Sequence, residues 1–507
     1  MSLLAGGGLP AGLAPQIDSR RWPEKVIQFG EGNFLRAFVD WMFHRINQAG
    51  LFGGRVVVVQ PIAAGLADRL NAQDGLYTVL LRGLRDGKPA EEREIVSSIS
   101  RAINPYADWE GFLRCAENPD LRFAVSNTTE AGIAYDPEDH PEARPPRSFP
   151  GKVTVFLYHR FQHFGGAPGR GLVFLPCELI DRNGDNLRAI VLRLAEEWNL
   201  GSDFAAWVRE ENVFANTLVD RVVTGYPRDE IEAITASLGY RDELLDTGEL
   251  FHLWVIEGPA ALAEELPFTK AGLNVVWTND MTPYRTRKVR ILNGAHTGSV
   301  PAAFLCGLDT VGEMMDDPVM GKFVRQLIFE EIIPSMAKAG LAKEMLVEFA
   351  AAVVERFRNP YIRHYLSSIM LNSASKFKTR CLPSLVEYQA LYGRLPERLV
   401  FSLAALTAVY RGGKIDGLTM TGRRQKGEFV MQDDRPVLEF FTAAWADFVP
   451  GPEGAQRLAQ RVLGNTGLWG QDLNAVPGLT AALAAAISRI DNLGINAAAA
   501  ALVKGGQ

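Results

Sequence analysis

A strand, a glycine turn and a helix follow one another near the N-terminus, and this order constrains the fold more than any other feature of the chain. Residues 25–29 form a short, mainly apolar run, and Gly30 and Gly32 follow it with one residue between them. The apolar positions that recur up to Phe43 predict a helix. A strand that runs through a Gly-x-Gly turn into a helix opens a dinucleotide-binding unit. The pattern therefore predicts an α/β domain.

The residues of this turn have distinct predicted parts in binding. Gly30 permits the tight turn, Gly32 lets the backbone approach a pyrophosphate, and the helix N-terminus faces its charge. The third glycine of the full fingerprint is absent, so a plain turn stays the alternative. The predicted cofactor-binding residues here are Gln28, Phe29, Gly30, Glu31, Gly32, Asn33, Phe34, Leu35 and Arg36.

A second apolar run indicates a parallel sheet. Residues 56–59 are all valine, which is typical of a strand buried on both faces. Gln60 and Pro61 follow, at the place where an acidic residue would bind the adenosine ribose. A neutral Gln leaves NADP open, but Arg69 is the nearest basic residue that could hold a 2′-phosphate. We therefore expect NAD as the cofactor, with Gln60 near its ribose.

Small polar residues follow a third run, residues 121–126. Asn127, Thr128 and Glu130 stand at its C-terminal end, where parallel sheets form a ligand crevice. We expect these three residues to bind the cofactor as well. An ordinary turn is the alternative.

A different motif, Lys288 to His296, lies in the middle of the chain. On a helix, Asn293 and His296 would lie about 140° and about 80° around the axis from Lys288, so one side can carry all three. Such a trio suits a carbonyl, because a lysine transfers the proton while an amide and an imidazole hold the developing alkoxide. This is the chemistry of a metal-independent alcohol dehydrogenase. The alternative is a helix with a solvated lysine and a capping asparagine.

Several strings, in this order along the chain, carry a family resemblance. They are residues 27–37, 175–184, 219–221, 288–296, 309–313 and 371–376. With them the chain resembles the long-chain polyol and mannitol dehydrogenase family over nearly its whole length from about Lys25. The resemblance implies a Rossmann-type N-terminal domain with a mainly parallel sheet and a mostly α-helical C-terminal domain.

The resemblance also implies roles for single residues. The family pattern Lys-x4-Asn-x2-His falls on Lys288, Asn293 and His296. It implies Lys288 as general acid/base, with the other two at the substrate oxygen. A substrate-contacting Asp and a substrate-contacting Lys of the family fall on Asp220 and Lys376.

The chain departs from the polyol-using relatives at two substrate contacts. Cys177-Glu178-Leu179 stands where they have Cys-Asp-Asn, and Ser368 stands where they have an Arg. Both differences point away from mannitol and towards a sugar acid. The resemblance itself implies the interconversion of D-tagaturonate and D-altronate in hexuronate catabolism. The carboxylate of this keto-hexuronate or aldonate could be held by Lys376, Lys378, Arg380 or Arg363. For the three residues other than Lys376, the alternative is a solvated helix face.

Three other functions stay open. Fructuronate reductase or polyol dehydrogenase activity would use the same trio and differ only in substrate contacts. An epimerase or isomerase that retains bound NAD would consume no NADH. A nucleotide-binding sensor would bind NADH and turn over nothing.

The pattern of the chain changes near residue 280. Strand-length apolar runs alternate with helical stretches before it, and long amphipathic stretches follow it. We place the dinucleotide-binding domain at residues 1–280 and a helical substrate and catalytic domain at residues 281–507. Gly294 and Pro301 predict a kinked or interrupted helix at the lysine motif. The later helices are expected at residues 319–329, 344–356, 396–410, 437–446 and 455–463.

Composition limits the classes of partner. The chain has 507 residues, a formal net charge of -6 and no basic tract, which argues against nucleic acid and anionic membranes. It has no long apolar run and no basic leader, so we expect a cytoplasmic monomer or small homo-oligomer. The four cysteines lack CxxC spacing, and His159 and His163 are expected to be a surface pair, so no metal site is predicted.

Overall fold

The computed structural model describes residues 2–5, 15, 17, 19–129 and 131–504. The chain divides into two compact units, Met1–Met281 and Thr282–Gln507. Within the described ranges, no helix combines the length and apolar character needed to cross a membrane.

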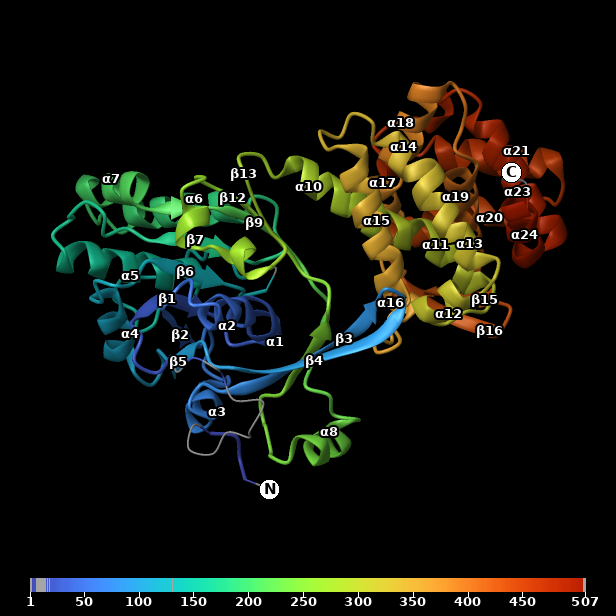
Figure 1. Cartoon of the computed structure of the whole chain (residues 1–507). Helices are drawn as coiled ribbons and strands as arrows, with labels where there is room; N and C mark the ends of the chain where they lie inside the picture. The colour runs from blue at the N-terminus through green and yellow to red at the C-terminus, as the bar shows by residue number, and fades with distance from the viewer. Residues whose placement is uncertain (1, 6–14, 16, 18, 130, 505–507) are drawn as a thin grey trace. The chain divides into compact units, whose positions relative to one another are not determined.

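A six-stranded parallel sheet forms the centre of the first unit (Figure 1). The chain runs from β1 outwards through β2 to β5 on one side, and then through β6 and β7 to β8 on the other. The strand order therefore reverses between β1 and β6, and open α/β sheets bind ligands beyond the carboxyl ends of the strands at such a point. In spatial order the strands are β5 (Ile99–Ile103), β2 (Arg55–Val59), β1 (Glu24–Phe29), β6 (Phe123–Ser126), β7 (Val173–Pro176) and β8 (Val213–Phe214).

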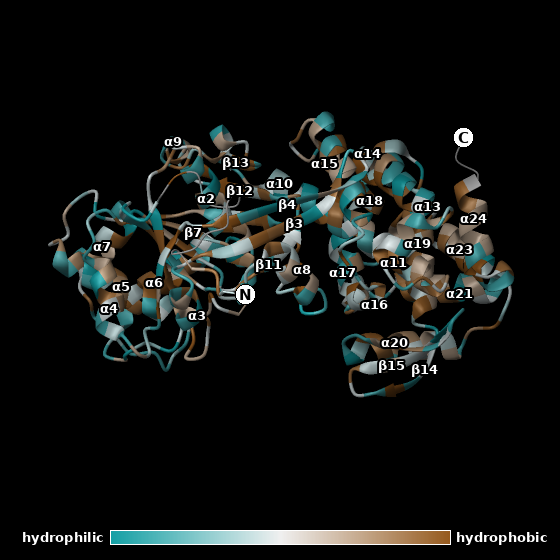
Figure 2. Ribbon diagram, turned by 60° about the horizontal axis from the view of Figure 1, so that its bottom comes forward, coloured by the Kyte–Doolittle hydropathy of each residue, from teal (hydrophilic) through white to brown (hydrophobic). Residues whose placement is uncertain are grey.

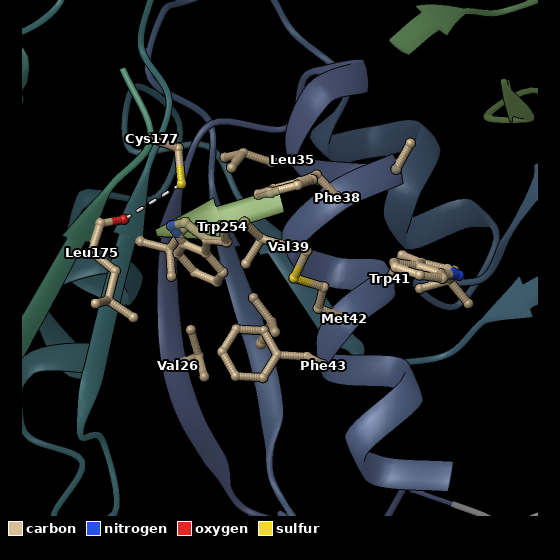
Figure 3. Close-up of a cluster of buried hydrophobic side chains, with 14 of the residues drawn as sticks. Val26, Leu35, Phe38, Val39, Trp41, Met42, Phe43, Leu175, Cys177 and Trp254 are labelled. Atoms are coloured by element: carbon tan, nitrogen blue, oxygen red, sulfur yellow. Dashed lines mark hydrogen bonds between the residues drawn. The ribbon is translucent and has the colours of Figure 1, made fainter. Parts of the chain in front are cut away.

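The central strands bury apolar side chains on both faces. Val26 of β1 packs with Phe43 and Trp254 on one face, as Figure 3 shows. Ile27 and Phe29 point to the opposite face, where helices α4 to α7 cover them. Burial of one such side chain contributes about 1.5–3 kcal/mol, so the apolar runs specify a sheet covered on both sides. The fold-class prediction for this half of the chain is confirmed.

The remaining helices and sheets of this unit surround that core. Strands β3 and β4 form a long hairpin, whose turn residues Asp86 and Gly87 have φ values of 54° and 71°, as a two-residue hairpin loop requires. The helices are α1 (Asn33–Leu35), η1 (Arg36–Asp40), α2 (Trp41–Gln48), α3 (Ala67–Ala72), α4 (Trp109–Ala116), α5 (Phe149–His163), α6 (Asn183–Glu197), α7 (Ser202–Glu211), α8 (Ile231–Leu238), α9 (Leu262–Glu265) and η2 (Phe268–Ala271). The two smaller sheets have the order β10 (Val223–Gly225), β11 (Asp246–Glu249), β3 (Tyr77–Arg85), β4 (Lys88–Val96), and the order β13 (Val275–Thr278), β12 (Leu253–Glu257), β9 (Asn216–Asp220).

The second unit is mostly helical, as predicted. Helices α11 and α19 are buried along nearly their whole length and pack against each other at its centre. The alanine-rich helices α23 and α24 are coloured mainly as apolar in Figure 2. The helices are α10 (Thr282–Arg287), η3 (Lys288–Asn293), α11 (Gly294–Leu305), α12 (Val311–Asp316), α13 (Met320–Gln326), η4 (Leu327–Ile332), α14 (Ile333–Ser335), α15 (Lys343–Phe357), α16 (Leu366–Ile369), α17 (Ser373–Arg380), α18 (Leu382–Tyr392), α19 (Glu397–Val409), α20 (Arg435–Ala446), α21 (Pro452–Leu463), α22 (Thr466–Trp469), η5 (Leu473–Ala475), α23 (Leu479–Leu493) and α24 (Ile495–Lys504).

A small antiparallel sheet in this unit was not predicted. Its strands are β14 (Gly412–Asp416), β15 (Thr419–Arg424) and β16 (Gly427–Gln432). Their sequences are rich in glycine and charged residues, because one face is exposed and the buried residues are Met420, Gly422, Phe429 and Met431. Such strands lack the apolar runs by which the buried strands of the first unit were recognised.

Candidate active site

The glycine turn after β1 packs tightly on one side and is open on the other. Gly30 has a φ of 119°, and a Cβ there would lie 2.8 Å from the backbone oxygen of Asn127. This position therefore requires glycine, and it joins the turn after β1 to the turn after β6. At Gly32 a Cβ would meet no atom within 4 Å. The helix begins at the next residue, and the N–H groups of its first turn have no acceptor within the helix, so this open side suits a phosphate.

Other residues predicted to bind the cofactor divide into exposed and buried ones. Gly32 and Asn33 are exposed at the start of the helix. Phe34 is half-buried and stacks on Phe38, with their ring centroids 4.9 Å apart. Gln28, Phe29, Leu35 and Arg36 are buried beneath the turn.

Arg36 ties the turn to the second sheet. Its side chain is only 2% exposed, and Nη2 donates to Asn33 Oδ1 at 2.6 Å. Nη1 donates to the backbone oxygen of Leu244, and Asp246 Oδ2 lies 3.5 Å from Nη2. The guanidinium therefore holds the turn in place, and direct contact between Arg36 and the cofactor stays a prediction.

A buried carboxyl group, Asp40, lies at the end of the same helical segment. It is 0% exposed, and Gln28 Nε2 donates to its Oδ2 at 2.9 Å. Burial raises the pKa of Asp40 to about 7, although the Gln28 hydrogen bond and the charge of Arg36 act in the opposite direction. The carboxyl group of Asp40 therefore stays protonated to much higher pH in the folded protein than in the unfolded chain. In the unfolded chain its pKa is about 3.9.

This raised pKa predicts a loss of stability at higher pH. As pH rises, Asp40 loses its proton in the unfolded chain before it does so in the folded protein. The stability that protonated Asp40 contributes is therefore fully present below about pH 4 and is lost as pH rises to about 7. Asp40→Asn removes this titration. We expect its melting temperature relative to wild type to rise between about pH 5 and about pH 8, by an equivalent of at most about 3 kcal/mol. Thermal unfolding at both pH values measures this, with exposed Asp120→Asn as the control; an equal difference at both would contradict it.

The side chain of Gln60 is hydrogen-bonded to the backbone of the loop that follows it. Its Nε2 donates to the backbone oxygens of Ile62 and Ala63 at 2.8 and 3.0 Å, and its Oε1 accepts from Ala67 N at 3.2 Å. Glu31 reaches the same loop, where it accepts a weak hydrogen bond from Leu66 N at 3.4 Å. Burial raises the pKa of Glu31. The end of β2 therefore brings together an amide that is already hydrogen-bonded and a carboxylate from the glycine turn.

Glu178 organises the turn after β6, a role that sequence reasoning missed. Its Oε1 accepts hydrogen bonds from the backbone N and the Oγ1 of Thr128, both at 2.9 Å, and its Oε2 accepts from Ser126 at 3.0 Å. Asn127 Nδ2 donates to the backbone oxygen of Cys177 at 3.2 Å. The acidic residue just after an apolar strand was the available signal, but it was treated only as a departure from the family. Glu130 lies outside the described residues.

The predicted substrate residue Asp220 is the last residue of β9 and is buried. Its neighbour Arg221 is buried too, and its guanidinium donates to the backbone oxygens of Ala37, Phe251 and Leu250. Arg221 therefore joins β9 to the helix after the glycine turn.

In the second unit, a π-helical turn carries the lysine motif. Residues Lys288–Asn293 form this turn, and the helix continues on both sides without interruption, with Pro301 inside α11. A π turn carries i→i+5 hydrogen bonds, so Asn293 lies one turn along from Lys288 on the same side of the helix. An α-helix, with 3.6 residues per turn, would place them about 140° apart around the axis. The helix is therefore irregular at this motif, as predicted, but the irregularity precedes Gly294 and aligns the two side chains. Lys288 and Asn293 are both half-buried.

His296 lies among rings and positive charges. Its ring centroid is 4.1 Å from that of Phe357 and 5.1 Å from that of His364. Burial, followed by the charges of His364, Arg356, Arg380 and Lys376, lowers its pKa well below the usual range. The imidazole is therefore neutral at pH 7, and its Nδ1 is buried without a hydrogen-bond partner in the described part of the chain.

Three basic residues whose charges lower the pKa of His296 form what we call the cationic cluster: Arg356, Lys376 and Arg380. They come from the end of α15 and from α17. Burial lowers the pKa of His364, whose ring lies beside that of His296, so it is not part of the cluster. Two other candidates for carboxylate binding are placed differently. Arg363 is exposed, and Lys378 lies against Gly470 at the end of α22.

The histidine pair that could have held a metal is placed differently in the structure. His159 on α5 lies 2.9 Å from Glu117 Oε1, which makes a half-buried pair rather than a ligand set. Among the described residues, no group of three or more His, Cys, Asp or Glu side chains is placed to hold a metal ion.

Comparison with known proteins identifies the family. Residues 24–270 match the mannitol dehydrogenase Rossmann domain, and residues 280–491 match the mannitol dehydrogenase C-terminal domain. The chain belongs to the mannitol dehydrogenase family. This is a family of oxidoreductases, and the resemblance inferred from the sequence strings is confirmed.

Altronate oxidoreductases are close relatives within the mannitol dehydrogenase family. The protein of Bacillus subtilis is 48% identical over 479 residues, which cover 94% of this chain and 95% of the relative. The protein of Yersinia enterocolitica is 48% identical over 483 residues, which cover 95% of this chain and 97% of the relative.

Two solved structures share this fold. Mannitol 2-dehydrogenase of Pseudomonas fluorescens, in a ternary complex with NAD and D-mannitol, is 22% identical with a TM-score of 0.67, covering 99% of this chain and 100% of that one. A substrate-free D-sorbitol dehydrogenase is 22% identical with a TM-score of 0.79, covering 97% of this chain and 98% of that one.

Proposed function

We propose that the protein is an NAD-dependent oxidoreductase that interconverts D-tagaturonate and D-altronate. The observation that carries this proposal is the cationic cluster around His296, because an anionic sugar acid is attracted there and a neutral polyol gains nothing from it. The altronate oxidoreductases that match this chain at 48% identity support the same substrate pair.

The glycine turn fits a dinucleotide. Gly32 offers open space at the helix N-terminus, and Gly30 holds the turn against Asn127. The N–H groups of the first helical turn would bind the pyrophosphate. When bound, NADH supplies the hydride for the carbonyl carbon.

The lysine motif supplies the proton. Lys288 donates this proton to the oxygen of the reduced carbonyl, and the lysine accepts the proton back when the alcohol is oxidised. Asn293 lies on the same side of the π turn and donates its amide N–H to this oxygen. His296 is neutral and offers an N–H donor as well, so it stabilises the growing negative charge without competing for the proton.

Substrate turnover tests the proposal. We expect NADH absorbance at 340 nm, its standard wavelength, to fall rapidly with D-tagaturonate and much more slowly with D-fructuronate or D-fructose. A preference for fructuronate would replace the substrate and keep the reaction class. No NADH oxidation with any of the three ketones, together with tight NADH binding, would contradict the proposal and favour an NAD-retaining epimerase or a sensor.

A further inference from the structure

The end of α17 is fixed against the start of α11. A Cβ at Gly294 would lie 3.1 Å from the backbone oxygen of Arg380, and Cys381 Sγ lies 3.4 Å from the backbone oxygen of Gly294. Arg380 Nη1 donates to Thr297 Oγ1 at 3.4 Å, and Thr297 directly follows His296. Backbone packing thus holds the guanidinium beside the imidazole.

The positive charges of Arg380 and Lys376 are not matched by acids. In the part of the chain that the structure describes, neither makes an ion pair, whereas the more deeply buried Arg290 and Arg398 each pair with a glutamate. The acid that acts on Lys376 is Asp433, and its carboxylate already accepts a hydrogen bond from Tyr410. A half-buried pair of like charges that forms no ion pair attracts an external anion.

Side-chain chemistry favours Arg380 over the other basic residues. Its planar guanidinium can bind a carboxylate through two parallel hydrogen bonds, which a lysine cannot do. Lys376 already donates to the backbone oxygen of Ile369 at 2.9 Å, which leaves two of its protons for a ligand. Arg363 is exposed, so its charge is screened by water.

We propose that Arg380, with Lys376 beside it, binds the substrate carboxylate and makes the enzyme select sugar acids over neutral sugars. This inference rests on the proposed function. In a keto-hexuronate the carboxylate and the keto carbon stand towards opposite ends of the carbon chain. Arg380 therefore binds the carboxylate end of the substrate, which does not react, and Lys288 transfers the proton at the keto end.

A matched pair of substrates tests this selectivity. D-Tagatose has the carbon chain of D-tagaturonate with a hydroxymethyl group in place of the carboxylate. For Arg380→Met we expect kcat/KM with D-tagaturonate to fall about 100-fold, mainly through KM, while kcat/KM with D-tagatose stays unchanged. Arg380→Lys keeps the charge and should retain part of the preference. Arg457→Met, on the exposed face of α21, is the charge-matched control and should change neither value.

The results also separate this inference from the proposed function. An equal loss on both substrates in Arg380→Met would overturn the inference and leave the proposed function standing. If wild type reduces no keto-hexuronate, calorimetric binding of D-altronate and of its alditol D-altritol decides the matter. A preference for altronate that Arg380→Met abolishes would uphold the carboxylate site without the proposed reaction. The absence of any preference in wild type would overturn it.

Discussion

Lys288→Met is expected to lower kcat for D-tagaturonate reduction by about 10²- to 10⁴-fold, the usual contribution of a positioned general acid. The loss arises because the oxygen of the reduced carbonyl must then take its proton from water. NADH binding should be unchanged, since the glycine turn belongs to the other unit. Stopped-flow reduction and fluorescence titration with NADH measure the two effects.

Two further variants make this test specific. Lys288→Arg keeps the positive charge but cannot exchange a proton at neutral pH, so it should be nearly as inactive as the methionine variant. Lys322→Met, an exposed lysine of α13, should behave like wild type. Substantial activity in Lys288→Arg would mean that charge alone suffices, and proton transfer would have to be assigned elsewhere.

The second large effect is expected at the glycine turn, where two substitutions of the same size should act differently. Gly30→Ala places a side chain at a φ of 119° and 2.8 Å from the backbone oxygen of Asn127. Backbone strain of this kind costs about 1–3 kcal/mol, and the clash adds to it. We expect a lower melting temperature together with loss of NADH binding.

Gly32→Ala should leave the ligand-free protein as stable as wild type, because its Cβ meets nothing within 4 Å. The methyl group occupies the space where the pyrophosphate would approach, so NADH binding should weaken about tenfold or more. Thermal unfolding with and without NADH separates the two glycines, and Gly312→Ala in α12 is a neutral control. Unchanged NADH affinity in Gly32→Ala would show that the pyrophosphate does not bind at this turn.

Local sequence signals located the parts of the fold that depend on neighbouring residues. The valine run at residues 56–59 predicted a strand buried on both faces, and Gly30 with Gly32 predicted the turn at the strand-order reversal. Periodicity also located long helices such as α15 and α19. It failed for β14 to β16, whose exposed faces carry polar residues.

The site depended more on tertiary structure. Packing against β11 buries Arg36, and the side-chain amide of Gln60 is hydrogen-bonded within its own loop. Their contacts with the cofactor stay predictions, because these tertiary contacts cannot be read from the local sequence. Glu178 acquired its role only because β7 lies beside β6, which brings its carboxylate to Thr128.

The sequence by itself determined the parallel sheet with its glycine turn, the helical second half and the order Lys288, Asn293, His296 along one helix. These features arise from residues close together in the chain, where periodicity and spacing report on structure directly. Only the tertiary structure decided that a π turn aligns Lys288 with Asn293, and that Arg380 lies beside His296 with no ion pair to any acid among the described residues. Those outcomes depend on helix packing between residues far apart in the chain, and spacing along one segment carries no information about it.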